Sequence, residues 1–263
     1  MLVFLRSLYI RLFSKNRFLF KINNLLLHLS LGALGYGNYR NEIESGELFF
    51  IKKYLSDKST SLCFDIGANV GDYSKLLLDN TKANIISFEP IPFLFKKLSV
   101  NLSNFSERVV LVNSGVGDKS KMLPIFYNKD NTLLSSFCEK MNRIDYVSFT
   151  DSVIVNVISI DAYCRDNNIS EIDFIKIDTE GYEKEVFQGA KETFKTIQPK
   201  FIQIEFNTHQ LFKSNSLLYF AEKLPNYNIY QLIYNGMRKV DAESPYSNIY
   251  RYSNFVFIRK DCD

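Results

Sequence analysis

The sequence of 263 residues has no tryptophan, two histidines and four cysteines that are widely spaced. No two cysteines form a C-x-x-C pair and neither histidine lies near a cysteine, which argues against a structural zinc site. Scattered cysteines are typical of reduced thiols in a cytoplasmic protein. Cys63, inside an apolar run, is expected to be a small buried residue.

Acidic residues are absent from the first forty positions, where six basic residues lie. The rest of the chain carries 26 basic and 29 acidic residues, a net charge of −3, so the whole positive excess belongs to the N-terminal end. A basic surface across the main body, as nucleic-acid-binding proteins have, is therefore not expected. We expect no nucleic-acid partner.

Linkers rich in glycine, serine or proline are absent, so we expect an N-terminal extension over residues 1–46 and one domain over residues 47–263. Leu5, Leu8 and Leu12 recur at helical spacing, and the longest charge-free stretch is too polar for a membrane span. Two arrangements of this helical extension remain open. We favour a layer packed on the main domain with its basic side outward; the alternative is an amphipathic segment at the inner face of the membrane.

A short apolar run at residues 61–66 leads into a glycine-rich turn, and a helical pattern follows. The turn has the spacing Asp65-x-Gly67-x-Asn69-x-Gly71. Glycines let the backbone approach a ligand closely, and the next helix begins with free N–H groups that attract polar ligand atoms. The pattern therefore predicts a strand, a ligand-binding turn and a helix.

A second apolar run ends in Glu89, which lies 24 residues after Asp65. A strand-end acid at about this spacing contacts ribose in nucleotide-binding α/β proteins, because a carboxylate can accept both protons of the diol. A third run at residues 109–112 precedes a loop in which Ser114, Val116 and Asp118 are candidates for contact with an adenine base.

The most specific segment is Lys176-Ile-Asp-Thr-Glu-Gly-Tyr-Glu183. Together with residues 64–71, 88–90 and 113–118, it resembles the FkbM family of methyltransferases over most of the chain. The resemblance implies a Rossmann-like class I methyltransferase fold, an α/β architecture with a mostly parallel sheet, helices on both faces and an antiparallel strand. Residues 228–234 and 255–259 independently predict a closing antiparallel pair of strands.

The resemblance also implies S-adenosylmethionine as methyl donor. The acceptor it implies is a hydroxyl on a sugar or glycan of cell-surface or secondary-metabolite biosynthesis. It places Glu89 at the donor ribose and Asp178 at the site of methyl transfer. The residues that it places along the methionine part of the donor are Asp65, Gly67, Asn69 and Gly71.

Methyl transfer to a sugar hydroxyl needs a base, because the neutral hydroxyl is a poor nucleophile. His209 follows the strand predicted over residues 201–206 and is one candidate base, although a surface histidine is an equal interpretation. Asp178 is the rival candidate.

Polar side chains also occur inside two predicted strands, where both faces are normally apolar. Lys176 shares a face with Asp178, and Glu205 shares a face with Gln203, because side chains alternate along a strand. We therefore expect Lys176 and Glu205 to form a buried ion pair near the catalytic edge of the sheet, where Glu205 is a third catalytic candidate.

A magnesium-assisted variant is conceivable, since Asp178, Glu205 and Asn207 lie at adjacent strand ends and offer oxygen ligands. Carboxylates at strand ends are common without a metal, so a metal-free site is favoured.

Two other functions share part of the pattern. An NAD-type oxidoreductase has the glycine turn and the strand-end acid, but the segment around Asp178 fits it poorly. A catalytically inactive nucleotide-binding module is opposed by the intact Asp65, Glu89 and Asp178. The oligomeric state stays open.

Residues 128–152 are polar and irregular, which is typical of a loop or lid on the acceptor side. Tyr127, Phe137 and Tyr146 are candidates for stacking on a sugar ring.

Overall fold

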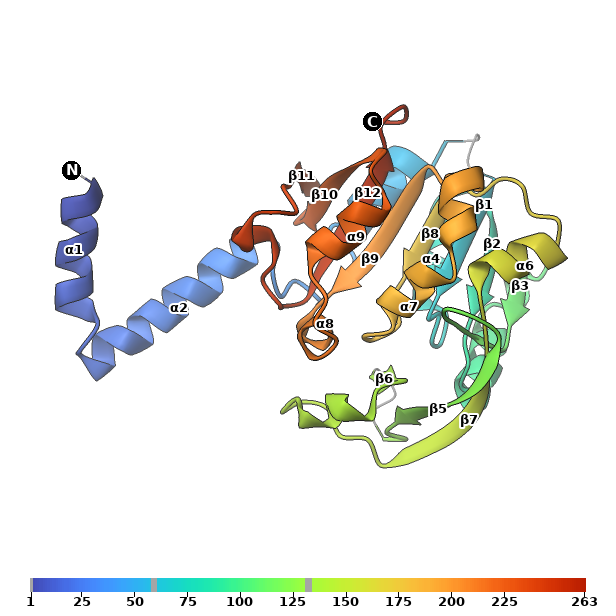
Figure 1. The fold of residues 1–263 in the computed structure, drawn as a ribbon, viewed down its shortest axis with the longest axis horizontal. Coiled ribbons are helices and arrows are strands. Elements are labelled where there is room, and N and C mark those ends of the chain that lie inside the picture. Colours follow the sequence, from blue (N-terminus) through green and yellow to red (C-terminus); the bar gives the residue numbers. More distant parts are fainter. Residues whose placement is uncertain (1, 58–60, 131–133) are drawn as a thin grey trace.

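The computed structural model describes residues 2–57, 61–130 and 134–263. Its largest part is an eight-stranded sheet with the strand order β11-β10-β12-β9-β8-β1-β2-β3 (Figure 1). The strands are β1 (Leu62–Ile66), β2 (Asn84–Phe88), β3 (Val109–Val112), β8 (Phe174–Ile177), β9 (Phe201–Phe206), β10 (Tyr227–Ile233), β11 (Gly236–Lys239) and β12 (Ser253–Arg259).

The five neighbouring strands from β9 to β3 are parallel, and β12 lies antiparallel between β9 and β10. This confirms the predicted α/β architecture. The antiparallel pair predicted over residues 228–234 and 255–259 is confirmed as β10 and β12. The edge strand β11 is an addition that the sequence analysis did not predict.

Side chains alternate along the central strands and reach two buried layers. On β1, Phe64 belongs to one hydrophobic cluster and Cys63 to the other; on β8, Ile175 and Phe174 divide in the same way. Helices α6, α7 and α9 supply the first layer, whereas α3, α4 and α5 supply the second. Strands covered on both faces are apolar throughout, which is why these runs stand out in the sequence.

The helices of the main body are short and mostly connect successive strands. They are α3 (Glu47–Phe50), a π-helical turn (Ile51–Leu55), α4 (Asp72–Asn80), α5 (Pro92–Asn101), a 3₁₀ turn (Ser103–Phe105), α6 (Ile160–Asp166), α7 (Glu183–Gln188), a π-helical turn (Thr193–Ile197), α8 (Thr208–Phe212), α9 (Leu217–Lys223) and a 3₁₀ turn (Pro245–Ser247).

A second, four-stranded sheet of order β4-β7-β5-β6 lies beside the main one (Figure 1). Its strands are β4 (Gly115–Val116), β5 (Lys121–Tyr127), β6 (Ser135–Ser136) and β7 (Asp151–Ile158). The sequence analysis did not predict this sheet, although Val153, Val155 and Val157 alternate with polar or exposed residues along β7. The region predicted as an irregular loop contains β6 and a 3₁₀ turn (Glu139–Arg143), and residues 131–133 lie outside the described residues.

Two N-terminal helices, α1 (Leu2–Phe13) and α2 (Arg17–Ala33), project away from the body (Figure 1). α2 has no buried residue, and Phe4 and Phe18 are 72% and 70% exposed. The predicted packed layer is therefore wrong, because helices of the main domain already cover both faces of the sheet. We call residues 2–33 the N-terminal arm. No helix in the described parts of the chain is long and apolar enough to span a membrane.

The segment after the arm runs along the C-terminal part of the body. Tyr36 is buried in the main hydrophobic cluster, and its hydroxyl donates to the carbonyl of Tyr246 at 2.7 Å. The N–H of Gly37 donates to the carbonyl of Tyr252 at 2.8 Å, and the ring of Tyr39 meets that of Tyr252 edge-on. Part of the predicted extension is thus integral to the main body.

Candidate active site

The turn between β1 and α4 holds the backbone against a neighbouring strand end. Gly67 has φ +86°, and a Cβ atom there would lie 1.8 Å from the carbonyl oxygen of Asp178, so only glycine fits. The N–H groups of Gly67 and Ala68 donate to the Phe88 carbonyl at 3.1 and 2.9 Å. The ends of β1, β2 and β8 therefore meet at the carboxyl edge of the sheet, where open α/β sheets bind their ligands.

Two cavities lie at this edge. One is lined by the Gly67 turn, the end of β2 and the segment after β8. The larger one is lined by Tyr39, Tyr73, Lys176 and Tyr252, among others. Both cavities share Gly67, Asn69 and Asp178, so the two spaces meet at the end of β8. We refer to them as the first and the second cavity.

Glu89 lies in the wall of the first cavity, where the sequence analysis places the ribose. Its carboxylate accepts from the N–H of Asn69 at 2.9 Å and from the N–H of Ile91 at 2.8 Å. Burial raises the pKa of Glu89 to about 8. The carboxylate oxygens retain further lone pairs, so the group can still accept from a diol.

The loop after β3 contributes backbone and small side chains to the first cavity. Gly115 and Val116 line it, and the Asn113 side chain donates to the carbonyls of Glu89 and Pro90 at 2.8 and 3.1 Å. Of the other two predicted base contacts, neither Ser114 nor Asp118 lines it. Asp118 instead pairs with Lys121 at the start of β5.

Asp65 is fully buried in β1 and lines neither cavity. Its Oδ2 accepts from the hydroxyl of Ser74 in α4 at 2.6 Å, while Oδ1 has no partner among the described residues. Burial raises the pKa of Asp65. Asp65 thus fastens α4 to the sheet, and its contact with the donor stays a prediction.

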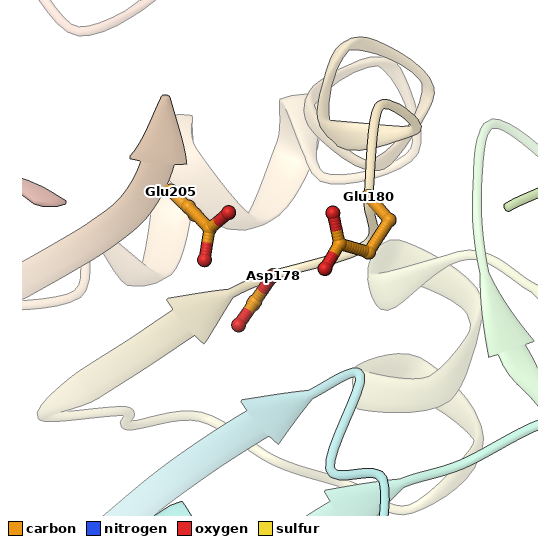
Figure 2. A group of neighbouring side chains, drawn as sticks. All are labelled: Asp178, Glu180 and Glu205. Carbon is orange, nitrogen blue, oxygen red and sulfur yellow. The ribbon is translucent and has the colours of Figure 1, made fainter. Parts of the chain in front are cut away.

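Three carboxylates converge at the ends of β8 and β9: Asp178, Glu180 and Glu205 (Figure 2). One ligand oxygen from each lies within 4.8 Å of the other two. Burial raises the pKa of Glu180, and burial together with the neighbouring carboxylates raises that of Glu205 well above its usual range. We call these three residues the carboxylate cluster. The sequence analysis predicted two of them and missed Glu180.

His209 lies directly behind Glu180. It is 2% exposed, and its Nδ1 is 2.9 Å from Oε2 of Glu180, so the interpretation as a surface histidine is wrong. Burial lowers the pKa of His209, but the carboxylate of Glu180 more than offsets this and the net shift is upward. His209 does not line either cavity, whereas Glu180 lines the first one. The histidine therefore reaches the cavity through Glu180.

The loop that carries Glu180 is held in an unusual backbone conformation. Glu180 has φ +51° and Gly181 has φ +96°. Glu183 fixes this conformation, because its Oε1 accepts from the N–H and hydroxyl of Thr179, both at 3.0 Å, and from the N–H of Gly181 at 3.1 Å. Backbone strain of this kind concentrates at functional sites. Glu180 and Glu183 both lie in the segment that carries the family resemblance, which was the available signal.

The predicted ion pair between Lys176 and Glu205 is wrong. Lys176 instead binds Asp178, with Nζ 2.9 Å from Oδ2, and its ammonium group lies 4.6 Å from the ring centre of Tyr73. In the sheet register Lys176 is opposite Gln203, so Glu205 lies two residues further along the neighbouring strand. Burial lowers the pKa of Lys176, but Asp178 and other nearby carboxylates raise it overall, so the side chain is cationic.

Asn207 is unsuited to the magnesium ligand set that the sequence suggested. Its carbonyl oxygen caps α8 by accepting from the N–H of His209 at 2.8 Å, and its amide group donates to Glu205 and to Glu180. The amide nitrogen of Asn207 therefore faces the carboxylates, and its carbonyl oxygen is already occupied by the helix cap. The oxygen ligands that this site offers to a cation are those of the carboxylate cluster.

The three aromatic candidates for sugar stacking lie in different surroundings. Tyr127 is buried against Phe93 and is not available to a ligand. Phe137 lines the first cavity and packs on Tyr182, with 4.7 Å between ring centres. Tyr146 is exposed and lines neither cavity.

A mostly parallel sheet with one inverted inner strand, a glycine turn after β1 and a buried acid after β2 define a class I, S-adenosylmethionine-dependent methyltransferase. Comparison with known families agrees: the methyltransferase FkbM domain matches residues 65–229, well over half of the chain. The chain belongs to the FkbM methyltransferase family. This membership confirms the resemblance seen in the sequence, and the oxidoreductase and inactive-module alternatives are not supported.

Two characterised relatives are similar to this chain. The 2-O-methyltransferase NoeI of Sinorhizobium fredii is 25% identical over 186 residues, which cover 66% of this chain and 75% of that protein. The hexuronic acid methyltransferase AglP of Haloferax volcanii is 24% identical over 160 residues, covering 60% of this chain and 62% of that protein. Among solved structures, a precorrin-6y C5,15-methyltransferase from Geobacter metallireducens matches with a TM-score of 0.45 at 13% identity, over 87% of this chain and 96% of that one.

Proposed function

We propose that this enzyme methylates a hydroxyl group on a sugar or glycan. The observation that carries the proposal is the carboxylate cluster, of which Asp178 lines both cavities where they meet beside the donor turn and Glu180 lines the first. The names of the two relatives support it, since one is a 2-O-methyltransferase and the other acts on a hexuronic acid. A glycan of cell-surface or secondary-metabolite biosynthesis is the acceptor class that we propose.

The donor fits the first cavity by its chemistry. The Gly67 turn leaves no room for a side chain and exposes backbone at the strand end, and Glu89 presents carboxylate oxygens to a ribose diol. We place the adenine against Gly115 and Val116 and the methionine part along Gly67 and Asn69. S-adenosylmethionine, when bound, supplies an electrophilic methyl group on sulfur.

Glu180 is the base in this proposal. It lines the first cavity, as Asp178 does, and it is the member of the cluster that is backed by a second proton-binding group, His209. With the donor bound, Glu180 would take the proton of the acceptor hydroxyl as its oxygen accepts the methyl group and the donor sulfur leaves as a neutral thioether. His209 positions Glu180 and stabilises its charge, while Lys176 orients Asp178. Glu205, the third member of the cluster, lines neither cavity and accepts from the amide group of Asn207.

The site already carries its own cations, so we propose that magnesium is not required. Lys176 compensates Asp178, and His209 compensates Glu180 when it is protonated. A magnesium ion bound by the carboxylate cluster would supply the same positive charge and would polarise the acceptor oxygen.

We place the enzyme in the cytoplasm, at the inner face of the membrane. The four cysteines are all free, as expected for a reducing compartment.

The test is transfer of a labelled methyl group from S-adenosylmethionine to a panel of neutral hexosides, hexuronosides and lipid-linked glycans, with the modified position mapped by NMR. We expect incorporation into at least one saccharide and a large loss of turnover in Glu180→Gln. Glu171→Gln, an exposed acid outside the site, is the matched control and should keep full activity. Transfer to proteins or nucleobases, with every saccharide left unmodified, would refute the proposal.

A further inference from the structure

The N-terminal arm exposes more apolar side chain than a helix in water normally does. Its largest exposed fractions are those of Val3 (82%), Phe4 (72%) and Phe18 (70%), and Leu25 and Leu29 are 59% and 61% exposed. Contiguous apolar surface of this kind marks a contact with a partner or a membrane. In the described residues, the body of the molecule reaches only the C-terminal end of the arm, where Leu31 packs on the main hydrophobic cluster, and leaves the rest of the arm uncovered (Figure 1).

One side of α2 carries a continuous row of apolar residues. They recur at intervals of four and three residues: Phe18, Ile22, Leu25 and Leu29. A polar row follows the neighbouring side at the same intervals: Arg17, Lys21, Asn24 and His28. Helical residues at this spacing share a face, so an apolar row and a polar row run side by side along α2, and further apolar residues, Phe20 and Leu27, are exposed on another side. The hydroxyl of Tyr9 donates to the side chain of Asn23, which links α1 to α2.

The charge of this region identifies the kind of partner. The six basic residues of the first forty positions are all exposed, and no acidic residue accompanies them. They are Arg6, Arg11, Lys15, Arg17, Lys21 and Arg40. The rest of the chain has a net charge of −3, so a second copy of the protein offers mainly a negative body or another basic arm. A bilayer with anionic headgroups matches both the positive charge and the apolar rows.

We propose that the N-terminal arm lies in the interface of an anionic membrane, with its apolar side chains at the acyl boundary and its basic side chains among the headgroups. The attachment of the arm gives this docking a consequence for the site. A ring nitrogen of His28 lies 2.9 Å from the guanidinium group of Arg251. The N–H of Gly37 donates to the carbonyl of Tyr252, a residue that lines the second cavity. Docking therefore holds that cavity close to the membrane surface. The proposal does not depend on the identity of the acceptor.

The experiment uses the full chain and co-sedimentation with two kinds of vesicle, pure phosphatidylcholine and phosphatidylcholine mixed with phosphatidylglycerol. We expect binding to the anionic vesicles, weakened by salt, and little binding to the neutral ones. Each basic residue at an anionic surface contributes about a fivefold gain in affinity. Neutralising three of them, in Arg6→Gln/Arg11→Gln/Lys15→Gln, should therefore weaken binding by about a hundredfold.

Two further variants separate charge from apolar contact. Phe18→Ser/Leu25→Ser/Leu29→Ser keeps every charge and should also lose binding. Lys96→Gln/Lys97→Gln/Lys195→Gln removes three exposed charges from the main body and should bind as the wild type does. All variants should melt at the wild-type temperature, because the changed residues are exposed.

The proposal is overturned if anionic vesicles do not bind the chain, or if the body variant loses as much binding as the arm variant. It is also overturned if sedimentation velocity without lipid shows a dimer that Phe18→Ser/Leu25→Ser/Leu29→Ser dissociates, because a second copy then covers the arm.

Discussion

Replacement of Glu89 by glutamine tests whether this buried acid is neutral in the folded protein before the donor binds. Burial raises its pKa from 4.5 to about 8. Between these values the folded chain holds a proton that the unfolded chain has released, so the free energy of unfolding falls as the pH rises. Each pH unit in this window costs about 1.4 kcal/mol, which gives about 2–3 kcal/mol between about pH 5.5 and 7.5.

Chemical denaturation of the wild type and of Glu89→Gln at several pH values measures this effect, because glutamine does not titrate. We expect the free energies of unfolding of the two proteins to differ by an amount that has a constant component. In addition, the wild type should lose about 2–3 kcal/mol of unfolding free energy relative to the variant over that pH range. Glu171→Gln, an exposed acid, should show a flat difference. A flat difference for Glu89→Gln as well would mean that Glu89 is already ionised in the folded chain, and the argument from burial would be wrong.

Donor binding provides a second measurement on the same residue. A ribose diol donates two hydrogen bonds to an ionised carboxylate, so binding must release the proton that Glu89 holds at neutral pH. The affinity of the wild type for S-adenosylmethionine should rise about tenfold per pH unit between about pH 6 and 8. Calorimetry in buffers of different ionisation enthalpy reports the released proton directly. If S-adenosylmethionine binds without the release of a proton, Glu89 does not bind the ribose.

Three other results are expected. In denaturation experiments, Gly67→Ala should lower the free energy of unfolding by at least about 3 kcal/mol, because φ is positive there and the added Cβ would meet backbone; it should also abolish donor binding. The control Gly236→Ala, whose Cβ would lie 3.6 Å from the nearest atom, should change the free energy of unfolding little. Glu180→Gln should lower kcat by about a hundredfold or more with nearly unchanged KM for the donor, and an unchanged kcat would exclude Glu180 as the base. Incubation with a chelator should leave activity intact; loss of activity that magnesium restores would assign the carboxylate cluster to a metal.

The strands of the central sheet could be predicted from the sequence, because burial of both faces of a strand gives a continuous apolar run. The apolar runs at β1, β2, β8 and β9 are bounded by glycines, acids or polar turns, and each proved to be a strand. The mostly parallel arrangement and the presence of an antiparallel strand came from the family resemblance, which is information that no single run contains, and the order of the strands was not predicted. β4 and β6 are two residues long, too short for any periodicity to appear.

The partners of the side chains at the site were harder to predict from the sequence, because they depend on the register of the strands and on backbone conformation. Lys176 and Glu205 do lie on adjacent strands, but the register places Lys176 opposite Gln203 and leaves Asp178 as the nearest carboxylate. Glu180 looked like a loop residue inside a motif. Its positive φ, fixed by Glu183, turns it toward the other carboxylates and toward His209.

The sequence by itself determined the α/β fold, the positions of the glycine turn and of the strand-end acids, and the unequal distribution of charge between the two ends of the chain. The glycine turn and the strand-end acids are local features, since each depends on residue types that are close together in the chain, and the charge distribution is a count along it. The tertiary structure alone decided which acid faces His209, which carboxylate neutralises Lys176, and that the N-terminal helices project from the body and touch it only at the end of α2. Such contacts join residues that are distant in the chain, and they are chosen by the competition of packing and charge across the whole fold.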